Sequence, residues 1–285
     1  MALNYNGSYN LMRFPGFKFK ALTLSYDDGL KADKRLIDIM LKYGLKGTFN
    51  INSGFMLDSV NSDRLLTPEE AFDLYTSTGM EVAVHGSYHL PVDKVPPETA
   101  VNDLIKDRIA LEKLFKRVIK GMAYPIGTLD DDSPAIVQKC GIKYARTIKL
   151  TENFELPDNW LKWNPTTRNI NPKFLSLAEE FLSLTENKYF WFNEPKLFFG
   201  WGHSFEFYKE EHWEFIERFA KLVGKKDDIW YATNGEIYDY VKAFDRLEFS
   251  SDGTFVHNPS SIDVYIKYIN NREIIVPSGK TVDLR

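Results

Sequence analysis

Residues 21–52 read ALTLSYDDGLKADKRLIDIMLKYGLKGTFNIN and contain the pattern that decides the fold. Residues 21–26 predict a short strand, and the Asp-Asp-Gly that follows favours a turn. Residues 33–45 place apolar side chains on one face of a helix and include Gly44, a typical helix stop. Residues 46–52 predict a second strand. A strand, a helix and a strand in this order predict a βαβ unit with parallel strands.

The same alternation of strands and helices continues to about residue 245. Further strands are predicted at 80–86, 120–127, 142–148, 196–203 and 229–233. Helices are predicted between and after them, at 67–80, 96–119, 133–141, 171–187, 212–226 and 234–244. We therefore predict an α/β fold, an irregular (β/α) barrel of about seven parallel strands.

The last forty residues have a different pattern. Residues 246–285 contain short strand-like segments separated by Gly, Asn and Pro turns. We expect two domains, a barrel over 1–245 and a small β-rich C-terminal extension over 246–285. The extension is a candidate surface for ligand binding or for homo-oligomer formation, and the sequence does not choose between these roles.

Composition places the chain among ordinary globular proteins. It has 285 residues, of which 44% are hydrophobic and 27% charged, and its net charge of −4 comes from well-mixed acids and bases. This balance argues against a nucleic-acid partner, and no run approaches the ~18 apolar residues of a membrane span. Residues 1–17 lack the pattern of a signal peptide, so we expect a cytoplasmic protein unless a leader has been removed. The single cysteine, Cys140, cannot form an internal disulfide.

Two pairs of polar residues lie where predicted strands end. Asp27 and Asp28 follow the first strand, and His85 and His89 stand four residues apart after the third. Each pair alone has an ordinary explanation as turn or loop residues. In a β/α barrel, however, these strand ends meet on one face. One aspartate and two histidines then form the three-ligand pattern of a catalytic divalent metal, and the second carboxylate remains free to act as a base.

Four motifs resemble those of the polysaccharide deacetylases, the carbohydrate esterases with a NodB-homology domain. SYDDG at 25–29 is similar to the family's Thr-Phe-Asp-Asp-Gly, and HGSYH at 85–89 to its His-(Ser/Thr)-x-x-His, with Gly86 in the Ser/Thr position. AYPIG at 123–127 resembles Arg-x-Pro-Tyr-Gly, and WGH at 201–203 resembles the late motif that ends in histidine. The four occur in the family's order, and the resemblance covers about 20–245.

The resemblance implies a metal-dependent hydrolase that removes N-acetyl groups from an amino sugar or polysaccharide. It implies that Asp27 is the general base and His203 the general acid. The metal ligands would be Asp28, His85 and His89, holding Zn²⁺, with Co²⁺ or Ni²⁺ as alternatives. The third and late motifs would contact the substrate and the oxyanion, and the residues concerned are Tyr124, Pro125, Ile126 and Trp201. Among them, the backbone N–H of Ile126 would donate to the oxyanion.

Several positions depart from the family pattern. The third-motif arginine is absent at Ala123, and we expect Arg146 to replace it beside Asp27, the alternative being a solvated charge at a strand end. Trp201 is predicted to stack on a sugar or to line the acetate pocket, with a core tryptophan as the alternative. Glu206 could orient His203, but we favour a carboxylate at a helix N-terminus.

Residues 149–171 are predicted to form a long loop. Its Trp160 and Trp163 either line the substrate cleft or pack in the core.

Two other functions remain open. One is hydrolysis of another non-peptide C–N amide bond in a small molecule, which the absent arginine and the expected cytoplasmic location favour. The other is a catalytically silent carbohydrate-binding barrel. Such a module would have no need for the five residues Asp27, Asp28, His85, His89 and His203 together.

Overall fold

A parallel sheet forms the centre of the protein in a computed structural model that describes residues 9–58, 62–187, 189 and 192–285. Within these residues all its strand pairs are parallel, in the order β6-β5-β4-β3-β2-β8-β7, and β9 pairs with the start of β2. The strands are β2 (Lys20–Asp27), β3 (Gly47–Ile51), β4 (Glu81–Val84), β5 (Gly121–Ala123), β6 (Tyr144–Arg146), β7 (Thr167–Arg168), β8 (Lys196–His203) and β9 (Ile229–Tyr231). The predicted parallel β/α architecture is confirmed.

The sheet curls so that its two edge strands approach each other. An isolated parallel bridge joins Arg146 of β6 to Trp163, and the same segment continues into β7, which pairs with β8. The predicted long loop at 149–171 therefore contains a two-residue strand and the seam of the barrel. Trp160 and Trp163 are buried in a hydrophobic cluster, so the structure favours core packing for both.

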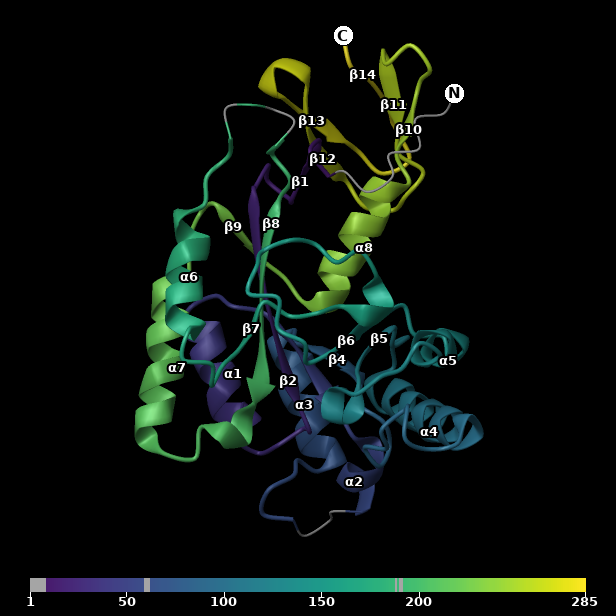
Figure 1. Ribbon diagram of the computed structural model, residues 1–285, viewed down its shortest axis with the longest axis vertical. Coiled ribbons are helices and arrows are strands. Elements are labelled where there is room, and N and C mark those ends of the chain that lie inside the picture. Colours follow the sequence, from purple (N-terminus) through teal and green to yellow (C-terminus); the bar gives the residue numbers. More distant parts are fainter. Residues whose placement is uncertain (1–8, 59–61, 188, 190–191) are drawn as a thin grey trace.

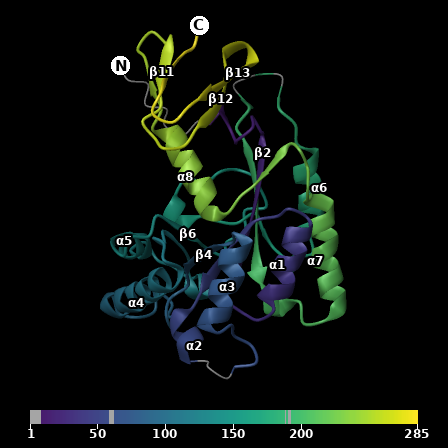
Figure 2. The same ribbon diagram turned by 180° about the vertical axis from the view of Figure 1, so that it is seen from behind.

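Helices cover the outside of the curled sheet, as Figures 1 and 2 show from two sides. They are α1 (Asp33–Lys42), α2 (Ser53–Asp58), α3 (Pro68–Thr78), α4 (Pro97–Phe115), α5 (Ser133–Lys139), α6 (Phe174–Ser183), α7 (Glu210–Val223) and α8 (Asn234–Asp245). Seven of them were predicted, and the short α2 was not. No described helix is long and apolar enough to cross a membrane.

The helix ends follow from local sequence. In α3, Thr67 caps the N-terminus, Glu70 completes a capping box, and Gly79 takes the left-handed conformation after the last turn with φ of 68°. The N-cap side chains satisfy backbone N–H groups that the first turn leaves without partners, and glycine adopts a positive φ without the steric cost of a Cβ.

The C-terminal extension lies beyond the end of the barrel at which β2 and β8 begin (Figure 1). Its strands form the sheet β10-β11-β14 and, with β1 from the N-terminal part of the chain, the sheet β1-β12-β13. The strands are β1 (Met12–Arg13), β10 (Glu248–Phe249), β11 (Phe255–His257), β12 (Val264–Tyr268), β13 (Arg272–Val276) and β14 (Thr281–Asp283). Val256 and Ile266 share one apolar cluster with Phe199 and Trp163 of the barrel. The domain boundary near 245 stays a prediction.

Candidate active site

The first motif lies where β2 ends. Asp27 is the last residue of β2, and Asp28 has φ of 82°, in the left-handed region that non-glycine residues seldom occupy. The N–H of Asp28 donates to the carbonyl oxygen of Asn50 at 2.9 Å, and Gly29 continues the turn with φ of 68°. Because the chain leaves the strand geometry here, neighbouring carboxylates face the same site instead of opposite faces of the sheet.

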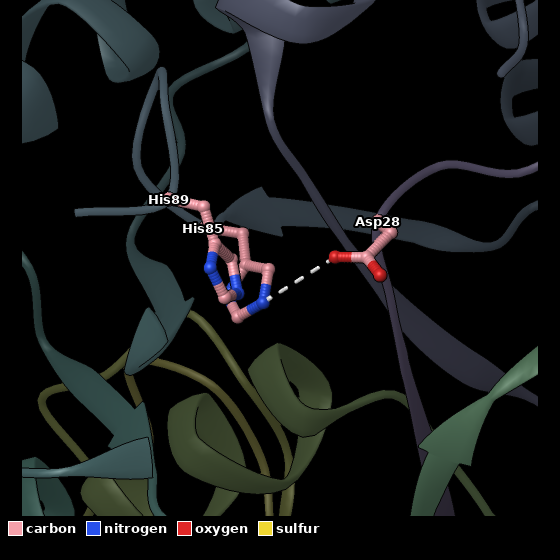
Figure 3. Close-up of side chains that lie close together, drawn as sticks. All are labelled: Asp28, His85 and His89. Carbon is pink, nitrogen blue, oxygen red and sulfur yellow. Dashed lines mark ion pairs between the residues drawn. The ribbon is translucent and has the colours of Figure 1, made fainter. Parts of the chain in front are cut away.

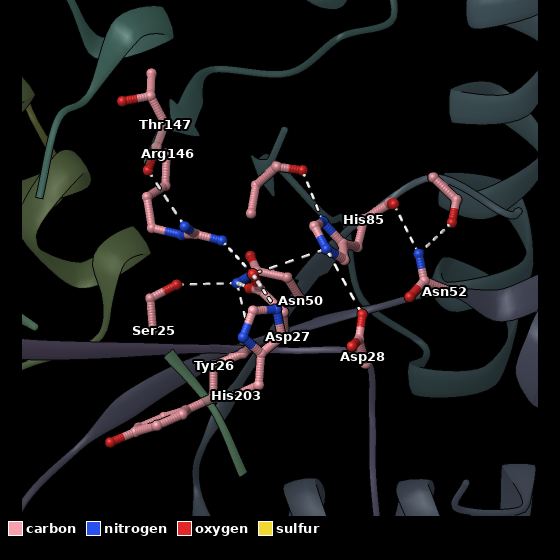
Figure 4. A network of polar contacts seen from close by, with 12 residues as sticks. Ser25, Tyr26, Asp27, Asp28, Asn50, Asn52, His85, Arg146, Thr147 and His203 are labelled. Carbon is pink, nitrogen blue, oxygen red and sulfur yellow. Dashed lines mark hydrogen bonds and ion pairs between the residues drawn. The ribbon is translucent and has the colours of Figure 1, made fainter. Parts of the chain in front are cut away.

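Asp27 is held in a buried polar cage (Figure 4). The guanidinium of Arg146 donates to its Oδ2 at 2.5 Å, and the amide of Asn50 donates to its Oδ1 at 2.8 Å. Burial would raise the pKa of Asp27, but the charges of Arg146, His85 and His203 outweigh it and hold the pKa below its usual range. The carboxyl group is therefore ionised near pH 7, the state that a general base needs.

Asp28, His85 and His89 converge at the same end of the barrel (Figure 3). One ligand atom from each lies within 4.8 Å of the others, and His85 Nε2 is 3.8 Å from Asp28 Oδ1. His85 Nδ1 lies 2.9 Å from the carbonyl oxygen of Ala123, an arrangement typical of metal-binding imidazoles. The other nitrogen, Nε2, is buried without a hydrogen-bond partner among the described residues. The three side chains therefore fit a divalent cation with an open coordination position.

Two buried carboxylates of α4 hold the histidine loop in place. Asp107 accepts hydrogen bonds from the N–H of His85 at 2.9 Å and the N–H of Ser53 at 2.7 Å, and Asp103 accepts one from the N–H of Tyr88 at 2.9 Å. Burial raises the pKa of Asp107 to about 7. Sequence reasoning missed both residues, although two acids four apart beside the apolar Leu104 give a signal.

His89 completes the loop in a left-handed conformation, with φ of 56°. Burial and the neighbouring His85 lower the pKa of His89, so its imidazole is neutral near pH 7. A neutral imidazole is the form that binds a metal ion.

His203 ends β8 on the other side of Asp27. Its Nε2 lies 3.8 Å from Asp27 Oδ2, and its Nδ1 lies 3.3 Å from Glu206 Oε1. Burial would lower the pKa of His203, but the hydrogen bond to Glu206 and the charge of Asp27 outweigh it and raise the pKa. Glu206 does lie in the first turn of a short 3-10 helix, Ser204–Glu206, where it accepts a hydrogen bond from the N–H of His203, as the preferred interpretation holds. The same carboxylate also contacts the imidazole, so the alternative that it orients His203 applies as well.

The third motif forms the turn after β5. Tyr124 and Pro125 are buried, and the hydroxyl of Tyr124 donates to the carbonyl oxygen of Leu161 at 2.9 Å. Ile126 has φ of 61° and its side chain points to solvent. A β-branched residue at positive φ is strained, and such strain is often retained at functional sites.

Arg146 and Trp201 take different positions relative to the predicted site. Arg146 lies beside Asp27, the position in which it was expected to replace the arginine that the third motif lacks. Trp201 is 5% exposed, and the guanidinium groups of Arg146 and Arg168 lie over its ring. The placement of Trp201 therefore favours the packed-tryptophan alternative over stacking on a sugar.

Comparison with known sequences agrees with this geometry. Residues 16–145 match the polysaccharide deacetylase family model. The chain is also 25% identical over 147 residues to a poly-beta-1,6-N-acetyl-D-glucosamine N-deacetylase of Staphylococcus aureus, a match that covers 47% of this chain and 49% of the relative. The chain thus spans about half the length of the curated relatives that it matches. The resemblance predicted from the motifs is confirmed, and this part of the chain is related to the polysaccharide deacetylases.

Solved structures extend the match in fold to most of the chain. A proposed polysaccharide deacetylase from Mycobacterium smegmatis superposes with a TM-score of 0.60 at 17% identity, covering 82% of this chain and 94% of that one. A family 4 carbohydrate esterase from Streptomyces lividans gives 0.51 at 12% identity, over 74% and 91% of the two chains. A pseudoenzyme of the same family from Bacillus anthracis gives 0.50 at 13% identity, over 80% and 68%. The fold is thus common to these proteins, and function must be argued from the site.

Proposed function

We propose that the protein is a metal-dependent N-deacetylase that hydrolyses the acetamide group of an N-acetylated amino sugar in a polysaccharide. The observation that supports this most strongly is the buried Nε2 of His85, which has no hydrogen-bond partner in the described part of the chain and lies beside Asp28 and His89. Such a nitrogen costs free energy when it is left without a partner, and a metal ion would supply one. The curated relatives suggest a polymer of β-1,6-linked N-acetylglucosamine as the first substrate to test.

Asp28, His85 and His89 would hold the cation, for which we propose Zn²⁺ because two imidazoles and one carboxylate suit it. When bound, such an ion polarises an amide carbonyl and lowers the pKa of water. Co²⁺ and Ni²⁺ accept the same ligands and remain alternatives.

The proton transfers are assigned to the residues on either side of this cluster. Asp27, kept ionised by Arg146, takes the proton from the attacking water. His203, whose pKa is raised, gives a proton to the amide nitrogen as its bond to the carbonyl carbon breaks. The N–H of Ile126, after Tyr124 and Pro125, is the proposed donor to the tetrahedral oxyanion. Acetate and a free amine are the products.

The test combines metal analysis with acetate release. Protein freed of metal is reloaded with Zn²⁺, Co²⁺ or Ni²⁺ and incubated with β-1,6- and β-1,4-linked N-acetylglucosamine oligomers. The expected result is metal-dependent release of acetate from at least one of them. Asp27→Asn should retain metal and lose most activity, whereas His85→Ala should lose both.

His257→Ala is the matched control for His85→Ala, because this imidazole lies in the extension and contacts only the hydroxyl of Thr281 among the hydrogen-bond partners described. It should keep metal and activity. Bound metal without acetate from any glycan would instead favour another amide substrate, and absence of metal binding under every loading condition would favour a silent carbohydrate-binding barrel.

A further inference from the structure

Two arginines share one aromatic ring beside the proposed catalytic pair. The guanidinium carbons of Arg146 and Arg168 lie 4.4 and 4.7 Å from the ring centroid of Trp201. Arg168 of β7 and Trp201 of β8 are direct neighbours in the parallel register, so their side chains leave the sheet on the same face. Strand pairing thus builds this part of the stack.

Each of these arginines also forms an ion pair with a buried carboxylate. Arg146 pairs with Asp27, and Arg168 pairs with Glu206. Glu206 in turn contacts His203 twice, through the imidazole Nδ1 at 3.3 Å and the backbone N–H at 3.2 Å. Asp27 is the proposed base and His203 the proposed acid, so each arginine supports one of the two proton-transfer groups.

The contacts therefore form a closed ring. His203 Nε2 returns to Asp27 Oδ2 at 3.8 Å and closes it. The members in order are Asp27, Arg146, Trp201, Arg168, Glu206 and His203. Figure 4 shows the part around Asp27, where Arg146 and His203 approach the carboxylate from different strands.

Trp201 holds its place in this ring without a polar anchor. It is 5% exposed, and its indole N–H makes no hydrogen bond within the described part of the chain. A guanidinium over an indole face contributes ~0.5–2 kcal/mol. The indole of Trp201 is thus held by packing and by the two guanidinium groups, and each guanidinium is held in part by the indole.

We propose that Trp201 and Arg168 are positioning residues that keep the His203 imidazole and the Asp27 carboxylate at a set distance and orientation. This inference rests on the proposed function for the roles of Asp27 and His203. Without the indole of Trp201, each guanidinium would lose one of the contacts that fix its position beside its carboxylate. A misplacement of ~1 Å in a catalytic group can cost about 100-fold in rate.

The kinetic test separates positioning from substrate binding. Trp201→Leu and Arg168→Met should each lower kcat by about 10- to 100-fold while KM changes less than about 3-fold. Trp201→Phe keeps an aromatic face and should recover most of kcat. Trp201→Leu combined with Arg168→Met should cost less than the product of the two single effects, because both act through one stack.

A matched control exists elsewhere in the fold. Arg35 lies 4.6 Å from the ring centroid of Trp213 and pairs with Glu210, so it repeats the arginine, tryptophan and carboxylate arrangement on the helices α1 and α7. Arg35→Met should leave kcat and KM unchanged. A loss of kcat equal to that of Arg168→Met would mean that such stacks act only through global stability, and would overturn the proposal.

A spectroscopic readout tests the positioning role of Trp201 and Arg168 without any substrate. Long-range ¹H–¹⁵N correlation spectra report which imidazole nitrogen carries the proton, and His203→Ala identifies the His203 signal. At pH 9 the wild-type protein should show the Nδ1–H tautomer that Glu206 requires, and Trp201→Leu and Arg168→Met should show a mixture of tautomers.

The two failures are distinguishable. If the wild type releases no acetate while the His203 tautomer responds to both substitutions, the proposed function fails and the positioning role of Trp201 and Arg168 is supported. If neither the His203 tautomer nor kcat responds although the variants are folded, the proposed positioning role is overturned. Exactly multiplicative losses in the double variant would also overturn the coupling through Trp201.

Discussion

Removal of Arg146 should destabilise the protein because it leaves the Asp27 carboxylate buried without its cation. The two side chains are 1% and 3% exposed, and their ion pair spans 2.5 Å. Breaking one partner of a buried pair costs ~3–5 kcal/mol. Arg146→Met keeps much of the side-chain volume and removes the charge, so we expect a loss in this range. The remaining hydrogen bond from Asn50 to Asp27 argues for the lower end, ~3 kcal/mol.

The pH dependence follows from the sign of the pKa change. In the wild type the folded-state pKa of Asp27 is lowered, so its contribution to stability is present above the unfolded pKa and is lost as pH falls through the folded pKa. Without Arg146, the largest contribution that opposes burial is lost, and the balance in the folded state shifts toward the protonated carboxyl. The deficit of Arg146→Met relative to the wild type should therefore be largest near pH 7 and should shrink toward pH 4.

Urea unfolding of metal-free protein measures this deficit directly. With an m-value of ~3 kcal/mol/M, a loss of 3 kcal/mol lowers the midpoint by about 1 M. The double variant Asp27→Asn/Arg146→Met should be at least about 1 kcal/mol more stable than Arg146→Met, because it no longer buries an unpaired charge. A deficit below about 1 kcal/mol at pH 7, or an equal deficit at pH 4.5 and pH 7, would refute this reasoning.

Three further predictions concern individual side chains. Glu206→Gln removes the largest contribution that raises the pKa of His203, so the alkaline limb of kcat/KM should move to lower pH in rate measurements; an unmoved limb would contradict the assigned contact. Burial raises the pKa of Asp33 to about 7, so this carboxyl weakens the fold as pH rises from about 4 to 7, by at most ~4 kcal/mol. In Asp33→Asn the free energy of unfolding should therefore fall less steeply between pH 4 and pH 7 than in the wild type. An unchanged slope would contradict the raised pKa of Asp33. Asp107→Ala removes the hydrogen bond that holds the backbone of His85, so it should weaken metal affinity by about 10- to 100-fold in a titration with Zn²⁺. An unaltered affinity would show that Asp107 does not position His85 for metal binding.

Long elements with strong local signals could be predicted from the sequence. β2 and β8 each have eight residues, and both end in the residues that form the site. The parallel arrangement follows from the helices between such strands, and it brings the strand ends to one face before any side chain is placed. For this reason Asp27, Asp28, His85, His89 and His203 could be grouped from their positions alone.

Elements that depend on tertiary contacts could not be predicted in the same way. β7 has two residues, and its pairing with β8 has no periodic signal in the sequence. Arg168 was missed for this reason, since its place beside Trp201 exists only after the strands have paired. Asn50 gave a weak signal as a polar residue inside a buried strand, and its contact with Asp27 explains that position.

The central claim is tested most directly by measuring bound metal and released acetate on one preparation of the wild-type protein. The account predicts one divalent ion per chain, and acetate release from an N-acetylglucosamine oligomer that stops on chelation and returns when metal is restored. Protein that binds no divalent ion under any loading condition, yet is folded, would contradict the assignment of Asp28, His85 and His89 and the mechanism that depends on it.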